Sequence, residues 1–218
     1  MKKAQKQSAF TMIELVMVIV VLGILTALAM PRMERDRTQE AADTILSYLR
    51  YAQHMALNDY RENPMDNKWQ RSFWQVKIEH CANGSGLFLE VGADKDYGGD
   101  IDKNESAIDP SNGKPMFWKN TDECSEGGDG TVSENIFIYK KFGVSSIEGS
   151  GGCDDVQHIG FDHLGRPHVS FSGSTTPDYD SYMESNCTFT FDVEGGESFS
   201  IRIEPETGYA HILEQDAS

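Results

Sequence analysis

The sequence predicts an α+β fold in which one long N-terminal helix packs on a mostly antiparallel β-rich head. Three observations predict it. Residues 10–30 form an apolar run that contains a single charged residue. Residues 31–62 continue with apolar side chains at helical spacing. From residue 63 onward apolar and polar positions alternate between turn-forming residues. We therefore expect a helix with two halves, 10–30 and 31–62, followed by a head over 63–218.

The apolar run from Phe10 to Met30 has the length of a membrane-spanning helix. At about 1.5 Å per residue it would extend over roughly 31 Å, close to the ~30 Å hydrocarbon core of a bilayer. The charged residue in this run is Glu14. An ionised group in a membrane helix costs free energy and marks a functional site that requires a cationic partner.

The stretch Ser8-Ala9-Phe10-Thr11-Met12-Ile13-Glu14-Leu15 resembles the prepilin signal of type IV pilins and type II secretion pseudopilins. The resemblance implies a leader peptide over residues 1–9 and cleavage between Ala9 and Phe10, with methylation of the new Phe10 amine. It also implies that Glu14 pairs with this amine on a neighbouring subunit during assembly. The family usually has Gly where this chain has Ala9.

The same resemblance implies a single-pass protein of the bacterial inner membrane, with a transmembrane helix at 10–30 and a periplasmic head. Its expected partners are other pilin or pseudopilin subunits, the prepilin peptidase and methylase, and the inner-membrane assembly platform. Two later segments, 159–167 and 201–209, resemble hairpins of the GspH/FimT group of minor pseudopilins. The implied function is that of a minor pseudopilin of a type II protein secretion system. The alternative is a minor pilin of a type IV pilus that acts in adhesion, motility or DNA uptake.

Two other interpretations of the N-terminus compete with a prepilin signal. The first is a secretory signal peptide, with the small residues Ala27 and Ala29 before Pro31. The second is an ordinary single-span anchor. Both leave the position of Glu14 unexplained, so we favour the prepilin interpretation.

The charge of the chain argues against nucleic acid as a partner. The net charge is −16, and removal of the three lysines of the leader would leave 16 basic against 35 acidic residues. Such a surface repels phosphate backbones. The sequence also contains no nucleophile elbow, phosphate loop or H-E-x-x-H motif, so we expect no enzymatic activity.

Four cysteines, an even number in a domain expected to be exported, predict two disulfides. They are Cys81, Cys124, Cys153 and Cys187, and they allow three pairings. A pair between the first two would clamp the long polar loop over 93–131. A zinc site that uses Cys153 with His158, His163 and His168 is the less favoured alternative.

We expect no cofactor, apart from an alternative that involves calcium. Asp100, Asp102 and Asn104 place three oxygen ligands at alternating positions, as a calcium loop does. The EF-hand pattern then fails, because Glu105 stands where Gly is required and Ser111 stands where a bidentate Glu is required. A solvated acidic loop is the favoured interpretation.

Alternating segments predict the strands of the head, with no second helix of note. Their ranges are 73–79, 86–91, 135–140, 156–161, 167–171, 187–193, 198–203 and 209–213. The first two are expected to form a pair joined across Asn83-Gly84. The Gly-rich segment 149–152 is expected to be a loop.

Overall fold

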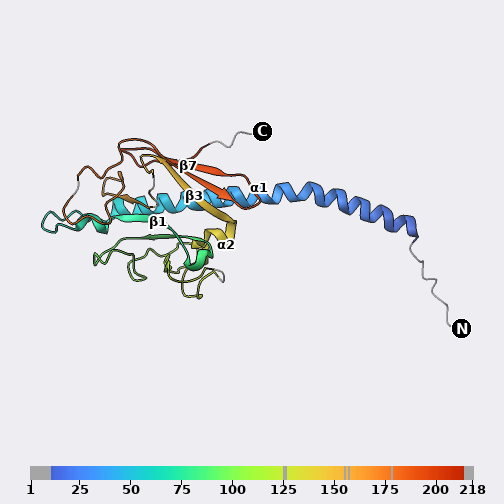
Figure 1. Ribbon diagram of the computed structural model, residues 1–218, viewed down its shortest axis with the longest axis horizontal. Helices are drawn as coiled ribbons and strands as arrows, with labels where there is room; N and C mark the ends of the chain where they lie inside the picture. The colour runs from blue at the N-terminus through green and yellow to red at the C-terminus, as the bar shows by residue number, and fades with distance from the viewer. Residues whose placement is uncertain (1–10, 125–126, 155, 157, 178, 214–218) are drawn as a thin grey trace.

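Helix α1 runs as one element from Met12 to Asn58 in the computed structural model, and Pro31 does not interrupt it. The structure describes residues 11–124, 127–154, 156, 158–177 and 179–213, without the side chains of 27–36. The first half of α1 projects away from the head, and the second half lies within it (Figure 1). The helix ends four residues before the predicted end at residue 62, because Asp59 leaves the helical conformation.

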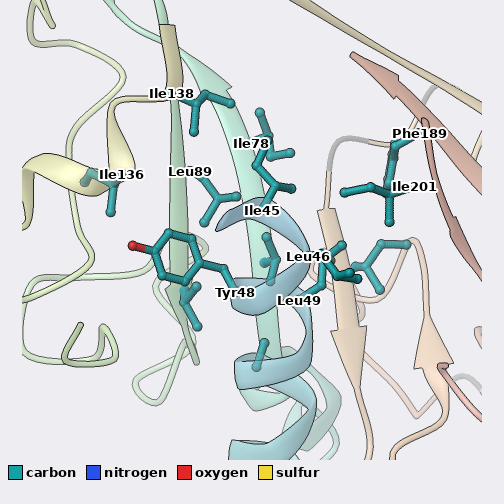
Figure 2. Packing of buried hydrophobic residues seen from close by; sticks show 14 of the residues in the cluster. Ile45, Leu46, Tyr48, Leu49, Ile78, Leu89, Ile136, Ile138, Phe189 and Ile201 are labelled. Atoms are coloured by element: carbon teal, nitrogen blue, oxygen red, sulfur yellow. The ribbon is translucent and has the colours of Figure 1, made fainter. Parts of the chain in front are cut away.

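The second half of α1 buries an apolar face that is wider than predicted. The buried side chains are Ala41, Ala42, Ile45, Leu46, Tyr48, Leu49, Ala52 and Ala56. The predicted stripe is confirmed, and Ala41 and Tyr48 widen it. Figure 2 shows the reason: Ile45, Leu46 and Leu49 lie between Ile78 and Leu89 on one side and Phe189 and Ile201 on the other. A helix that packs between two layers must be apolar on more than one narrow stripe.

The first sheet is antiparallel and has the order β2-β1-β4-β5. Its strands are β1 (Trp74–His80), β2 (Leu87–Gly92), β4 (His158–Phe161) and β5 (Pro167–His168). The predicted hairpin between β1 and β2 is confirmed. Its turn includes the short 3-10 helix η2 (Ala82–Gly84), in which Asn83 and Gly84 have φ of 57° and 66°. Asn and Gly adopt this left-handed conformation more readily than other residues.

The second sheet is also antiparallel, with the order β3-β6-β7-β8. Its strands are β3 (Val144–Gly151), β6 (Cys187–Val193), β7 (Phe199–Ile203) and β8 (Ala210–Ile212). Buried residues alternate with half-buried or exposed ones along β6 and β7, as expected for a sheet with one face on the core. The rings of Phe191 and Phe199 stack across these strands, with centroids 4.9 Å apart. The predicted α+β class with antiparallel sheets is therefore confirmed.

Three predictions of secondary structure are wrong. Residues 135–140 form the end of a 3-10 helix, η3 (Glu134–Ile136), and the start of helix α2 (Ile138–Phe142). Gly143 ends α2 with φ of 78°, a conformation that favours glycine. Residues 149–151, expected in a loop, belong to β3, which pairs with β6 along its length. The strand expected over 167–171 stops at His168, and a further 3-10 helix, η1 (Trp69–Ser72), precedes β1.

The two predicted disulfides are present and join Cys81 to Cys124 and Cys153 to Cys187. The first ties the β1–β2 turn to the long loop, as the clamp interpretation expected. The second ties the end of β3 to the start of β6. Because Cys153 is bonded to another cysteine, the zinc alternative is wrong.

Asp109 anchors the long loop to α1. Its side chain is 1% exposed and accepts hydrogen bonds from the hydroxyls of Ser111, Ser133 and Tyr48 at 2.7, 2.5 and 3.1 Å. The amide of Asn135 donates a further bond at 2.9 Å. Burial raises the pKa of Asp109, but the hydrogen bonds from Ser133, Asn135 and Ser111 outweigh it and bring the pKa to about 2.

The disulfide between Cys153 and Cys187 closes a loop of 34 residues, so its removal should destabilise the head. In the double variant Cys153→Ser, Cys187→Ser we expect the free energy of unfolding to fall by about 3–4 kcal/mol, because the unfolded chain gains conformational freedom. Chemical denaturation of the full chain in detergent micelles, monitored by tryptophan fluorescence, measures this change. An unchanged denaturation midpoint would contradict the prediction.

The lowered pKa of Asp109 makes stability depend on pH. A carboxyl group whose pKa is lower in the folded state stabilises that state above its ordinary pKa of 3.8 and loses this effect as the pH falls toward about 2. We therefore expect Asp109→Asn to be less stable than the wild type at neutral pH, with a difference that shrinks between these two values. Urea denaturation at a series of pH values checks this, with the exposed Asp43→Asn as the control.

Candidate functional site

The projecting half of α1 exposes an apolar surface on all its sides. Every large apolar side chain described between Met12 and Leu25 is at least 51% exposed. Soluble proteins rarely leave such a continuous apolar surface in contact with water, and a helix that is apolar all round is normally covered. This half of α1 must therefore be shielded from water by another apolar surface. Among the described residues, no helix is both long and apolar enough to traverse a membrane.

Glu14 is held at the start of this half by a capping box. The Thr11 backbone N–H and the Thr11 hydroxyl each donate a hydrogen bond of 2.8 Å to Glu14 Oε2. The Glu14 backbone N–H donates in return to the Thr11 hydroxyl at 3.4 Å. A negative side chain in the first turn is also favoured by the helix dipole. The predicted processing residues Ala9 and Phe10 lie outside the described residues.

The Glu14 carboxylate remains exposed although it caps the helix. It is the one charged side chain described between Thr11 and Thr26. When an apolar partner surface covers this half, the carboxylate must either stay at an edge in contact with water or meet a cation. The projecting half of α1 is therefore an apolar helix surface that carries one accessible carboxylate.

Three acidic side chains of the long loop lie close together, and they are not the three that the sequence predicts as calcium ligands. Carboxylate oxygens of Asp94, Asp96 and Glu105 all lie within 4.8 Å of one another. Backbone N–H groups of Lys95 and Asp96 donate to Glu105 Oε1 at 2.7 and 3.0 Å, and that of Asp102 donates to Oε2 at 3.0 Å. Glu105 thus uses both oxygens to fold the loop around itself.

The predicted calcium ligands Asp100, Asp102 and Asn104 do not belong to this group. The Asp100 carboxylate accepts a hydrogen bond of 3.1 Å from Lys77 Nζ. Asp102 and Asn104 belong to the turn that Glu105 closes. Calcium binding at Asp100, Asp102 and Asn104 stays a prediction.

A buried chain of Ser, His and Asp escaped the sequence analysis. His168 Nδ1 lies 2.8 Å from Ser181 Oγ, and His168 Nε2 lies 3.4 Å from Asp162 Oδ2. The three side chains are 5% exposed or less. Arg166 also donates to Asp162 at 2.7 Å. Burial raises the pKa of Asp162, but the hydrogen bonds from His168 and Arg166 outweigh it and lower the pKa.

The hydrogen-bonded side chains of Ser181, His168 and Asp162 stabilise the turn between β4 and β5 and present no nucleophile to a substrate. A catalytic serine must be reached by the substrate and activated at an open surface, whereas Ser181 is 4% exposed. Ser181 follows His168 at a sequence separation of 13, in a loop without a recognisable motif. No spacing in the sequence could therefore have identified the contact.

The comparison with family models supports the N-terminal signal. The prokaryotic N-terminal methylation motif matches residues 4–30. This match supports a type IV pilin-like prepilin signal, of a pilin or pseudopilin kind, and the motif belongs to a structural family rather than a catalytic one. No curated protein and no solved structure matches the chain. The GspH/FimT assignment of the head stays a prediction.

Proposed function

We propose that this protein is a minor pseudopilin of a type II secretion system. It is cleaved between Ala9 and Phe10, methylated at Phe10, and assembled through α1 into a periplasmic pseudopilus. The observation that carries the proposal is that the methylation motif over residues 4–30 coincides with a projecting apolar half of α1, in which Glu14 is the one acid among the described side chains of residues 11–26. The head then lies in the periplasm, and the inner-membrane platform adds the subunit to the fibre.

Cleavage creates the cation that Glu14 requires. The new Phe10 amine is a positive charge four residues from the carboxylate in the sequence. When the apolar halves of several subunits pack together, both charges leave water, and each is costly unless it meets the other. Apolar packing has no preferred direction, so an ion pair between the Phe10 amine of one subunit and Glu14 of another sets the register of the subunits.

The head supports the choice of a minor pseudopilin of the GspH/FimT group. The hairpin β4–β5 with its turn at 162–166 and the hairpin β7–β8 with its turn at 204–209 are the features that resemble this group. A subunit of a type IV pilus would use the same helix for assembly. The two assemblies must therefore be distinguished by what they produce, which is protein export or surface pili.

The assembly role of Glu14 can be tested in cells. In the Glu14→Ala variant we expect incorporation into sheared fibres to fall by roughly tenfold or more, because the methylated amine of a neighbour would be buried without a partner. Immunoblots of the fibre fraction measure incorporation, and mass spectrometry should find the same methylated Phe10 start as in the wild type. The matched control is Val18→Leu, an apolar exchange on the same exposed half.

Two results would contradict this account. Wild-type incorporation of the Glu14→Ala variant would exclude the ion pair. A mature protein that begins after Ala29 would show that residues 1–29 act as an ordinary signal peptide.

The secretion role is tested by loss of the protein. Cells without it should retain folded secreted enzymes in the periplasm and keep their surface pili. Enzyme assays on the medium and the periplasmic fraction, together with electron microscopy of the pili, measure these two products. Loss of pili with normal export would overturn the proposal in favour of a type IV pilus.

A further inference from the structure

The head contains a polar cavity between the strands β1 and β2 and the long loop that follows them. Its volume is about 220 Å³. Four carboxylates line it: Glu79, Glu90, Asp100 and Asp102. The other lining groups include the aromatic rings of Phe117 and Trp118 and the lysines Lys77 and Lys119. The cavity is separate from the projecting helix and from the acidic trio of the loop.

Glu90 is the most buried carboxylate of this lining. It is 3% exposed, and its Oε1 accepts one hydrogen bond of 3.0 Å from the backbone N–H of Trp118. Within the described part of the chain, no hydrogen bond reaches Oε2 and no ion pair involves this carboxylate. A carboxylate has room for about four donors, so a cation that entered the cavity would find a free acceptor. Burial raises the pKa of Glu90 to about 8, as expected for an acid without a cationic partner.

The ammonium group of Lys77 already contacts two of the other carboxylates of this lining. Lys77 Nζ forms ion pairs with Glu79 and, at 3.1 Å, with Asp100. Lys77 and Glu90 lie opposite each other on β1 and β2. The lining still carries four carboxylates against two lysines, so its net charge is negative. The chemistry of the site thus accepts an ammonium, and one position for it remains open beside Glu90.

We propose that this cavity binds the cationic side chain of a lysine or arginine from a partner protein. The volume lies below the roughly 300–1,000 Å³ of small-molecule sites, and it suits one extended side chain. Aromatic rings next to carboxylates attract organic cations through their π-faces. The chain as a whole has a net charge of −16, which attracts a basic partner surface. Lys77, placed among the carboxylates, opposes a divalent metal ion. This inference does not depend on fibre assembly.

The test uses the full chain in detergent micelles and two matched probes. One is Nα-acetyl-lysine N-methylamide, and the other is the norleucine analogue, which has the same chain without the ammonium. The indole N–H signal of Trp118, identified by comparison with Trp118→Phe, reports on the cavity wall. At a pH above about 8, where Glu90 is ionised, we expect a saturable shift with the lysine probe and none with its analogue.

Variants locate the bound cation. Glu90→Gln keeps the shape of the side chain and should raise the dissociation constant about tenfold, the usual effect of losing a charged hydrogen-bond partner. Asp100→Asn, a change at a side chain that is 83% exposed, tests the same cavity without a risk to folding. It should also weaken binding. Glu148→Gln, an exposed acid of β3 outside the cavity, should leave the dissociation constant unchanged.

Three results would overturn the proposal. An equal shift with the norleucine analogue would show apolar binding that does not require a cation. An unchanged dissociation constant in both Glu90→Gln and Asp100→Asn would place the probe elsewhere. A response to calcium ions without a response to the lysine probe would identify a metal site.

Discussion

The head depends on one helix that packs against two sheets at the same time. Buried side chains of α1 contact β1 and β4 of the first sheet and β7 and β8 of the second. Polar bonds fix this arrangement: Gln53 Nε2 donates at 2.8 Å both to Gly165 O in the β4–β5 turn and to Thr207 O in the β7–β8 turn. Arg50 donates to Ala210 O at 3.0 Å at the start of β8. One side of α1 thus sets the position of one sheet relative to the other.

The sequence predicts the elements whose local pattern agrees with their environment. The stripe of α1 and the hairpins around Asn83 and Gly165 follow from periodicity and turn chemistry. Residues 135–140 were expected to form a strand but form helical turns. Ile136, Phe137 and Ile138 are all buried there, and a short apolar run that is buried on more than one side has no period that separates a helix from a strand. Strand β3 was not predicted because its sequence lacks an apolar pattern. It is rich in Ser and Gly, and its pairing with β6 rather than its composition makes it a strand.

The candidate sites divide in the same way. The role of Glu14 could be predicted because the motif that identifies it is short and contiguous in the sequence. Asp109 meets Ser133 and Asn135 from 24 and 26 residues away, and Asp162 meets His168 across a turn. Glu90 becomes a buried acid only when the backbone of Trp118 closes over it. These groups are brought together by the path of the long loops, and no spacing in the sequence encodes that path.

An unbroken α1 links its two halves mechanically. The helix continues past Pro31, although proline removes one backbone hydrogen bond from a helix interior. The projecting half therefore continues, as one helix, from the residues between Ala41 and Ala56 that pack against the two sheets. In a fibre assembled as proposed, the ion pair at Glu14 would set the height of the whole head along the axis. The cavity beside Glu90 would then recur at a defined height, so a basic partner would meet it only where the fibre brings that level within reach.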